Sequence, residues 1–300
     1  MAYNTYSDQI ADLAAFKNRL LSWLARFPVS CYLDNNQYPS SYHSNECIVG
    51  VGFEKTLLID QPGNAFAHLK TLIDERPKWL LGFFSYDLKN ETERLHSGNF
   101  DGIEMPAMFF FEPEILVLIS GNTVTISSKR DNPQKVWSEI QSATLALADC
   151  SPLELQLNNR IPKSEYLDTV AHIRDHIKCG EVYEMNYCQE FFSTGHHINP
   201  AETFRQLNKT AQAPFSAFLR SNDKYLMSTS PERFMKKTGN KLISQPIKGT
   251  IKKGASAAEN EQLKLQLKVD EKERAENVMI VDLVRNDLTK SSVFGSILSL

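Results

Sequence analysis

The stretch FSAFLRSNDKYLMSTSPERFMKKTGNKLISQPIKGT, residues 215–250, sets the pattern that decides the fold. Its apolar runs come in two pairs, one around the polar residues 221–223 and one around Gly239-Asn240, which predicts two successive β-hairpins. Strands that follow one another without an intervening helix pair antiparallel. We therefore expect an α+β fold in which helices flank antiparallel sheets, rather than a doubly wound fold.

The first half of the chain continues this pattern of adjacent strands. Apolar residues at helical spacing predict helices over 6–27, 64–76 and 133–147. Short apolar runs predict strands over 31–33, 47–53, 56–59, 79–86, 108–111, 114–120 and 123–127. A Gly121-Asn122 turn between the last two strands predicts a further hairpin.

Polar residues 149–160 form a candidate linker, which divides the chain into portions 1–150 and 161–300. After it we expect a helix over 165–178, capped by Ser164 and stopped by Gly180. Predicted elements then follow in this order: a strand-like run over 182–194, a short helix over 200–209, a surface loop over 252–260 and one long helix beyond it.

Composition excludes several classes of function. A net charge of -3 in 300 residues gives no basic excess for nucleic acid, and no apolar run is long enough to cross a membrane. The five cysteines form no C-x-x-C pair, which favours reduced thiols and a cytoplasmic protein. His172 and His176 lie four residues apart on a predicted helix, but without the glutamate of a metalloprotease helix. We therefore interpret them as a solvated face rather than a zinc site.

Three short pieces carry candidate chemistry. Lys248 lies between an apolar residue and a Gly-Thr turn, and desolvation there would lower its pKa and make the amine a nucleophile. Glu232 offers a carboxylic acid next to a strand. Glu273 and Glu276 lie on one face of the last predicted helix, where carboxylates can bind a metal ion. Each residue taken alone is more often a surface charge, and only their order along the chain favours a site.

Five motifs resemble the chorismate-utilising enzymes, which include anthranilate synthase component I, aminodeoxychorismate synthase component I, isochorismate synthase and salicylate synthase. The motifs are residues 180–186 (GEVYEMN), 214–218 (PFSAF), 230–234 (SPERF), 246–250 (PIKGT) and 270–288 (DEKERAENVMIVDLVRNDL). The resemblance is dense from about Ile161 onward and thinner before it. It implies an anthranilate synthase component I-like fold, with a chorismate-binding catalytic portion over 161–300.

Within that family, the lysine at position 248 resembles the aminodeoxychorismate branch, since the anthranilate branch carries alanine there. The isochorismate and salicylate branch has a water-activating lysine where this chain has Glu184. The resemblance therefore implies amination of chorismate at C4, toward 4-aminobenzoate and folate. It implies Mg²⁺ as cofactor and a glutamine amidotransferase subunit as the partner that supplies ammonia.

The resemblance also assigns roles to residues. Lys248 would add to the ring at C2, and Glu232 would protonate the departing C4 hydroxyl. Gly249 and Thr250 would bind substrate, and Glu276 would bind the metal. Asn277 and Glu184 depart from residues common in relatives.

Two alternatives stay open beside this reading. One is an anthranilate synthase component I. The other is a non-catalytic module that binds tryptophan or chorismate, because relatives hold tryptophan in a pocket beside the segment equivalent to Pro214, Phe215 and Ser216.

Relatives continue beyond the position equivalent to Leu300, where this chain enters an expected strand over 295–298. The resemblance places a second metal-binding glutamate and groups that hold the substrate carboxylate in that further portion. We therefore expect a C-terminally truncated chain with low activity and an open sheet edge.

Overall fold

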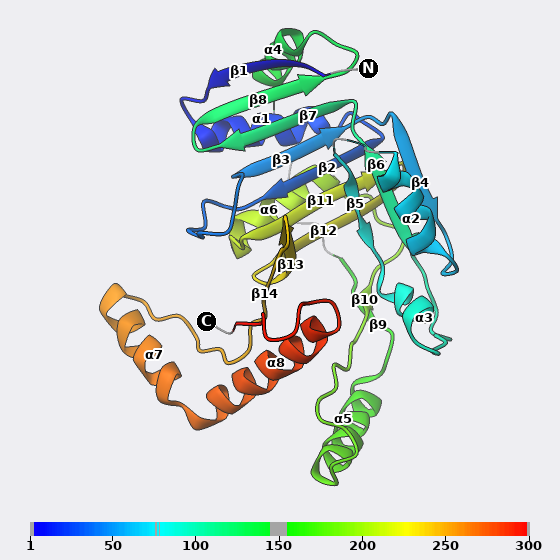
Figure 1. Cartoon of the computed structure of the whole chain (residues 1–300), viewed down its shortest axis with the longest axis vertical. Helices are drawn as coiled ribbons and strands as arrows, with labels where there is room; N and C mark the ends of the chain where they lie inside the picture. The colour runs from blue at the N-terminus through cyan, green and yellow to red at the C-terminus, as the bar shows by residue number, and fades with distance from the viewer. Residues whose placement is uncertain (1–2, 76, 78, 145–154, 299–300) are drawn as a thin grey trace. The chain divides into compact units, whose positions relative to one another are not determined.

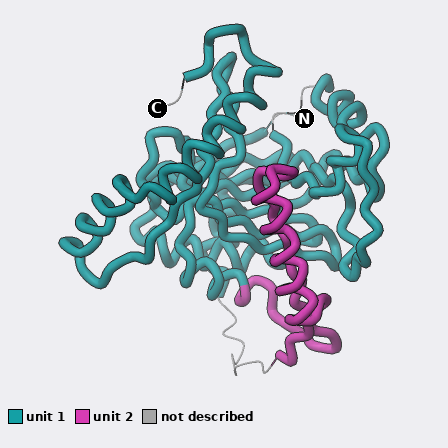
Figure 2. The backbone as a smooth tube through the Cα atoms, turned by 90° about the horizontal axis from the view of Figure 1, so that it is seen from below, with its two compact units in different colours: residues 1–144, 204–300 teal, residues 145–203 magenta. Residues whose placement is uncertain are grey.

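A computed structural model describes residues 3–75, 77, 79–144 and 155–298. Within them the chain forms two compact units, residues 1–144 with 204–300, and residues 145–203 (Figure 2). The units differ from the predicted portions 1–150 and 161–300, because strands from the second portion complete a sheet that begins in the first. The predicted linker over 149–160 lies outside the described residues as far as 154.

A seven-stranded antiparallel sheet forms the framework of the first unit (Figure 1). In spatial order its strands are β1 (Asn4–Gln9), β8 (Thr123–Ser128), β7 (Ile115–Ser120), β3 (Cys47–Val51), β2 (Val29–Asp34), β11 (Phe215–Ser221) and β12 (Lys224–Ser230). The hairpins β7–β8 and β11–β12 confirm the predicted turns, with Gly121 at φ 56° and Asn222 at φ 57°. Ser216 on β11 lies opposite Asp34 on β2, so sequence segments about 180 residues apart share one register.

The predicted helix over 6–27 is wrong in its first third. Residues 4–9 form the edge strand β1, which pairs with β8 so that Tyr6 lies opposite Ile126. Helix α1 (Leu13–Leu24) begins only after Asp12, whose side chain accepts a hydrogen bond from the amide of Ala15 at 2.9 Å. Pairing with the sheet outweighs the helical spacing of Tyr6 and Ile10, because a free sheet edge gains a complete hydrogen-bonded partner.

A three-stranded sheet, in the order β4 (Lys55–Ile59), β6 (Met108–Glu112) and β5 (Leu81–Phe84), shares a core with the larger one. Leu81, Phe109 and Phe111 of the smaller sheet cluster with Val29, Cys31 and Leu219 of the larger sheet. Helix α2 (Ala65–Asp74) connects β4 to β5, and the 3-10 turn η1 (Tyr86–Leu88) and helix α3 (Lys89–Thr92) lie between β5 and β6. Antiparallel sheets with separate helices confirm the α+β expectation.

Two helices pack on the larger sheet. Helix α4 (Pro133–Ser142) contacts α1, and Trp137 of α4 lies 5.3 Å from Phe16 of α1 between ring centroids. Helix α6 (Pro200–Ala211) buries Phe204, whose ring lies 5.8 Å from that of Tyr32 on β2 and 5.6 Å from that of Phe218 on β11. The sheet is therefore covered by aromatic side chains from both halves of the sequence.

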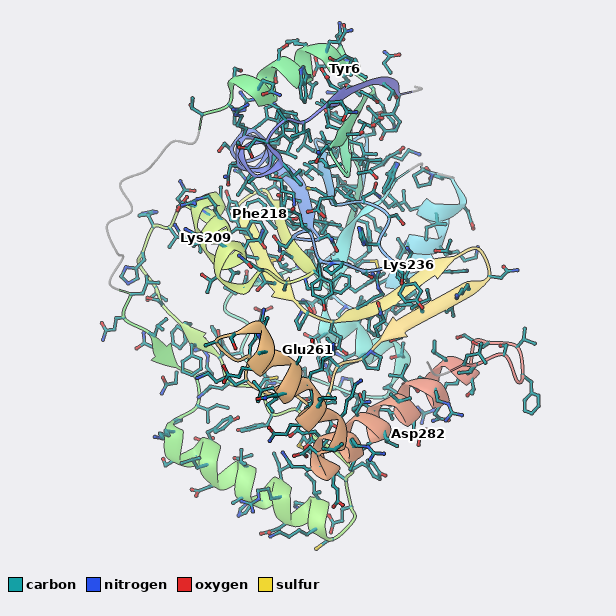
Figure 3. The ribbon with its side chains drawn as sticks, turned by 90° about the vertical axis from the view of Figure 1, so that its left-hand side faces the viewer. Tyr6, Lys209, Phe218, Lys236, Glu261 and Asp282 are labelled. Atoms are coloured by element: carbon teal, nitrogen blue, oxygen red, sulfur yellow. The ribbon has the colours of Figure 1, made fainter. Side chains whose placement is uncertain are left out.

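The predicted second hairpin is confirmed as β13 (Arg233–Thr238) and β14 (Lys241–Gln245), with Gly239 at φ 56° in its turn. Beyond it, the single predicted helix is two, α7 (Ala257–Val269) and α8 (Glu271–Thr289), with α7 beginning inside the predicted loop over 252–260. Figure 3 shows Glu261 on α7 and Asp282 on α8. Every residue of these two fully described helices is at least partly exposed. Residues 295–298 do not form the expected strand.

The second unit contains helix α5 (Lys163–Lys178) and the short pair β9 (Asn158–Asn159) and β10 (Phe191–Phe192). The predicted helix is confirmed, but Pro162 rather than Ser164 precedes its first turn, and Gly180 follows it at φ 73°. Of the predicted strand over 182–194, only residues 191–192 are extended and paired. Throughout the described ranges, no helix is both long and apolar enough to span a membrane.

Candidate active site

The turn over residues 246–250 is the centre of the candidate site. It leaves the end of β14 and reverses at Gly249, which has φ 75°. This left-handed conformation favours glycine. A Cβ atom at Gly249 would also lie 2.9 Å from the backbone oxygen of Glu273. The turn therefore lies directly against the first turn of α8.

Glu232 reaches this turn from the start of the second hairpin. Its amide donates to the hydroxyl of Ser230 at 3.2 Å, which fixes the bend around Pro231. Its carboxylate oxygen Oε1 accepts a hydrogen bond from the amide of Ile247 at 3.3 Å. Glu232 thus contacts the residue that directly precedes Lys248.

Glu273 holds the other side of the same turn. Its Oε2 accepts a hydrogen bond from the amide of Thr250 at 2.8 Å. The amide of Glu273 itself donates to Asp270 Oδ1 at 3.0 Å, so the helix cap fixes the backbone that carries this carboxylate. Lys248 therefore lies, half-buried, between two amides that two separate carboxylates bind.

Glu276 lies one helical turn after Glu273 on α8. Its Oε1 is 3.5 Å from the ammonium group of Lys272, which is 3.5 Å from Glu273 Oε1 as well. The charges of Glu276 and then Glu273 raise the pKa of Lys272. The two carboxylates therefore share one exposed cation.

The carboxylates of Glu273 and Glu276 match the hard oxygen ligands that Mg²⁺ prefers. In the described part of the chain, no group of three or more histidine, cysteine, aspartate or glutamate residues could hold a metal ion. Mg²⁺ keeps several waters and commonly takes only one or two protein carboxylates. Carboxylate oxygens such as those of Glu276 fit Mg²⁺ chemically, and binding of the ion by Glu276 stays a prediction.

Of the predicted tryptophan pocket, Ser216 and Phe215 contact residues outside the turn over 246–250. Ser216 is buried on β11, where its hydroxyl donates to the carbonyl of Ala213 at 3.1 Å and accepts from Asn36 Nδ2 at 3.0 Å. Phe215 lies under the guanidinium of Arg233, 4.7 Å from the ring centroid, and Pro214 is half-buried. Whether these residues bind tryptophan stays a prediction.

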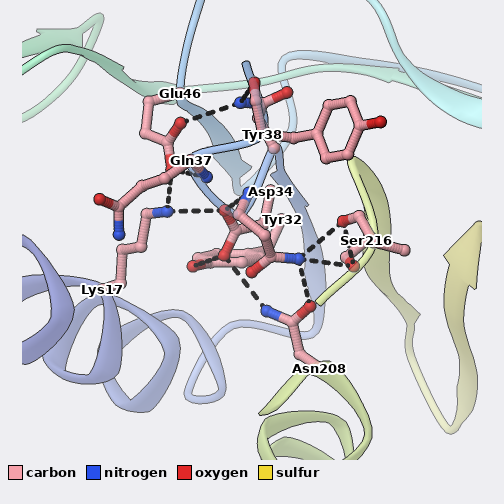
Figure 4. A network of polar contacts seen from close by, with 11 residues as sticks. Lys17, Tyr32, Asp34, Gln37, Tyr38, Glu46, Asn208 and Ser216 are labelled. Carbon is pink, nitrogen blue, oxygen red and sulfur yellow. Dashed lines mark hydrogen bonds and ion pairs between the residues drawn. The ribbon is translucent and has the colours of Figure 1, made fainter. Parts of the chain in front are cut away.

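Beside Ser216 lies a polar network that the sequence reasoning missed (Figure 4). Lys17 of α1 donates to Asp34 Oδ1 at 2.7 Å and also contacts Glu46, and all three side chains are nearly buried. Asn208 of α6 donates to Asp34 Oδ2 at 3.2 Å. No local pattern identifies such a network, because its members lie on separate elements. The one available signal was the charged Asp34 at the end of an apolar strand.

Electrostatics inside this network follow from its burial. Burial alone lowers the pKa of Lys17, but the charge of Asp34 and hydrogen bonds to Asp34 and Glu46 outweigh it, so the pKa is raised. Burial also raises the pKa values of the Tyr32 hydroxyl and the Cys47 thiol well above their usual range. The network is therefore an ion-paired core feature rather than a set of reactive groups.

Both histidines of α5 are exposed, which confirms the solvated face expected from the sequence. Nδ1 of His176 lies 2.5 Å from Oε2 of Glu181, which follows the end of the helix. That the pair binds no zinc stays a prediction.

Known proteins match the chain over most of its length. The profile of a family described as chorismate binding enzyme matches residues 31–298. Aminodeoxychorismate synthase component 1 of Escherichia coli (strain K12) is 29% identical over 264 residues, which cover 84% of this chain and 58% of that protein. Anthranilate synthase component 1 of Thermus thermophilus is 26% identical over 228 residues, covering 73% of this chain and 49% of that protein.

Among solved structures, anthranilate synthase component I from Streptococcus pneumoniae superposes with a TM-score of 0.67 at 21% identity. The superposition covers 84% of this chain and 63% of the other. At this identity the likeness shows the fold alone, and it agrees with the expected anthranilate synthase component I-like architecture. The chain spans about half the length of the curated relatives it matches, 58% and 49% for the two above.

Proposed function

The chain belongs to the family of chorismate binding enzymes, and from this membership we propose that it is the chorismate-aminating component of an aminodeoxychorismate synthase. One observation carries the proposal: Lys248 lies in a turn held on one side by Glu232 and on the other by Glu273. The carboxylate of Glu232 binds the backbone directly before Lys248, and an amine with a carboxylic acid close by is what covalent catalysis with a general acid needs. The similarity to aminodeoxychorismate synthase component 1 supports the choice of branch.

In the proposed reaction the amine of Lys248 forms a bond to C2 of chorismate. The ring double bonds shift, and the C4 hydroxyl leaves as water after Glu232 gives it a proton. The proton that the Lys248 amine loses on adding to C2 restores Glu232. Ammonia then attacks C4, the electron pair returns through the ring, the bond to Lys248 breaks, and one proton of the ammonia passes to the Lys248 nitrogen. The sum is chorismate plus ammonia giving 4-amino-4-deoxychorismate plus water. Gly249 lets the backbone approach the substrate, and Thr250 offers it a hydroxyl.

Mg²⁺ is part of the proposal as cofactor, with Glu276 as its protein ligand and Glu273 beside it. When bound, the ion supplies Lewis-acid polarisation of the ring carboxylate. We place the reaction in the cytoplasm, on the route to 4-aminobenzoate and folate. A glutamine amidotransferase subunit supplies the ammonia, and the designation "component 1" of the relative supports a partner component.

The decisive experiment separates the adduct from turnover. Purified chain is incubated with chorismate and Mg²⁺ without ammonia, digested and analysed by mass spectrometry. We expect the peptide that contains Lys248 to gain the mass of chorismate minus water. Ammonium added in a parallel reaction should release the label and yield 4-amino-4-deoxychorismate, identified by chromatography.

Two variants control this experiment. Lys248→Ala should abolish both adduct and product while the melting temperature is kept. Lys252→Ala removes an exposed lysine from the same loop and should change neither. An unlabelled Lys248 together with undiminished product in Lys248→Ala would refute the covalent role.

Anthranilate synthase component 1 is the second candidate, because the Thermus thermophilus relative bears that name. The same reaction decides between the two, since anthranilate is fluorescent and 4-amino-4-deoxychorismate is not an aromatic amine. A non-catalytic tryptophan-binding module is the third candidate. Calorimetry that shows tryptophan binding without chorismate turnover would favour it.

A further inference from the structure

Glu273 makes an interaction that its place in the helix does not require. Asp270 and Glu273 stand at the N-cap and N3 positions of α8, where a glutamate usually reaches back to the amide of the N-cap residue. Here the amide of Asp270 already donates to the carbonyl of Gln266 at 3.0 Å, at the end of α7. The junction between the two helices thus leaves the Glu273 carboxylate available for another donor.

That donor is the backbone of the Lys248 turn. Glu273 Oε2 lies 2.8 Å from the amide of Thr250, and the side chain is 21% exposed. The backbone of Glu273 provides the surface against which Gly249 lies, because a Cβ at Gly249 would meet both its carbonyl oxygen and its Cβ. One residue therefore contacts the two positions that directly follow Lys248.

The contact is mechanical as well as electrostatic. Gly249 adopts a left-handed conformation, with φ 75°, and the turn at this residue lies against α8. A single well-aligned bond to a charged acceptor contributes about twice as much as a neutral one. Glu232 holds Ile247 more weakly, at 3.3 Å, so Glu273 provides the tighter of the two attachments.

We propose that Glu273 is a positioning residue, whose carboxylate fixes the Lys248–Gly249–Thr250 turn on α8 and thereby sets the direction of the Lys248 amine relative to Glu276. The catalytic part of this proposal rests on the proposed function of Lys248, whereas the attachment itself does not. The role needs a hydrogen-bond acceptor at position 273; the negative charge strengthens the bond but is not essential to it. This requirement distinguishes it from a role as metal ligand, which needs the charge.

Three variants of the 300-residue chain test the attachment. Glutamine keeps an acceptor oxygen in place of the carboxylate, and alanine removes it. Hydrogen exchange of the peptide spanning 246–255 is measured without substrate or metal. We expect Glu273→Ala to speed exchange there about tenfold and Glu273→Gln to stay within about twofold of the parent. Glu271→Ala, an exposed substitution in the same helical turn, should leave exchange unchanged.

Ammonia-dependent turnover is then measured for the same set. A displacement of about 1 Å can cost on the order of 100-fold in rate. We therefore expect kcat to fall by about that factor in Glu273→Ala, and Glu273→Gln to recover at least tenfold of it. Glutamine exchanging as fast as alanine, with equal loss of kcat, would overturn the proposal in favour of a charge-dependent role. If the parent chain forms neither the Lys248 adduct nor the product, the proposed function fails, and the exchange result still decides the attachment.

Discussion

At the scale of single residues, Glu232 combines two roles that one substitution separates. Its carboxylate accepts from the amide of Ile247, and in the proposed reaction it also gives a proton to the C4 hydroxyl. Glutamine keeps the acceptor and loses the proton. We expect Glu232→Gln to lower kcat about 10²–10⁴-fold, the usual contribution of general acid catalysis, without lowering the melting temperature.

The control is Glu261→Gln, an exposed glutamate on α7 that lies outside the turn (Figure 3). Its turnover should equal that of the parent. Turnover within threefold of the parent in Glu232→Gln would remove Glu232 from the reaction.

Loss of the Lys17 ammonium group should lower the free energy of unfolding strongly. Lys17 is the cation between Asp34 and Glu46, with 12% of its side chain exposed. Lys17→Met keeps most of the volume and leaves two buried carboxylates without their cation, which we expect to cost about 3–5 kcal/mol of unfolding free energy. Lys70→Met is the matched control, because its ion pair with Asp74 is exposed and contributes about 0–1 kcal/mol. Urea titration followed by circular dichroism measures both.

The ion pairs of Lys17 with Asp34 and Glu46 also predict how the stability of the protein depends on pH. The pKa of Lys17 is raised in the folded protein, so its stabilising contribution is complete below the unfolded pKa of about 10.4 and is lost as pH rises through the folded value. The stability difference between parent and Lys17→Met should therefore be constant from neutral pH to about pH 10 and narrow above it. Parallel curves up to pH 12 would show that the ion pair is not the cause.

A residue of the candidate site can be predicted from the sequence when it lies in a continuous motif, and not when its importance comes from a contact between distant segments. Lys248, Glu232 and Glu273 could be proposed from the sequence because they lie in motifs that are continuous along the chain. In the structure the last two contact the turn around the first, while their roles stay predictions. Lys17 and Asp34 were not found. Their significance comes from a contact between α1 and β2, which neither segment encodes by itself.

At the scale of elements, the smaller sheet contains a position that only glycine fits. A Cβ on Gly82 of β5 would lie 2.0 Å from the carbonyl oxygen of Phe109, in the neighbouring strand β6. Backbone cannot move aside cheaply, so Gly82→Ala should destabilise the protein by about 1–3 kcal/mol through overpacking. Gly98→Ala, with nothing within 4 Å of the added Cβ, should be nearly neutral. Equal melting temperatures for the two variants would contradict the strand pairing.

Hairpins were the elements best predicted, because a turn of two or three polar residues between apolar runs is a local signal. Both hairpins of the opening stretch form where expected. The edge strand β1 was missed because its pairing with β8 joins residues more than a hundred positions apart. The boundary between α7 and α8 was missed because Asp270 ends one helix and caps the next, although a D-x-x-E pattern stood there.

At the scale of the whole molecule, the main unpredicted feature is that one sheet draws on both halves of the sequence. Strands β11 and β12 extend the sheet of β2 and β3, and Leu219 joins the core cluster of Val29 and Phe111. Local patterns predict that a strand exists and not which strand it pairs with. A division of the chain by local composition therefore does not reveal which strands share a sheet.

Tryptophan fluorescence can test whether the two halves unfold together. All three tryptophans, Trp23, Trp79 and Trp137, precede residue 150, whereas Phe218 lies on β11. Phe218 is fully buried against Phe204 and Tyr225, so Phe218→Ala should cost about 3–5 kcal/mol. Because the sheet is shared, we expect the fluorescence transition to shift by that full amount and to coincide with the circular dichroism transition. Phe234→Ala, the same change at a side chain 85% exposed on β13, should shift neither transition.

A fluorescence transition that stays in place while the circular dichroism transition moves would mean that the first half folds without β11. In that case the sheet would be two cooperative units meeting at β2.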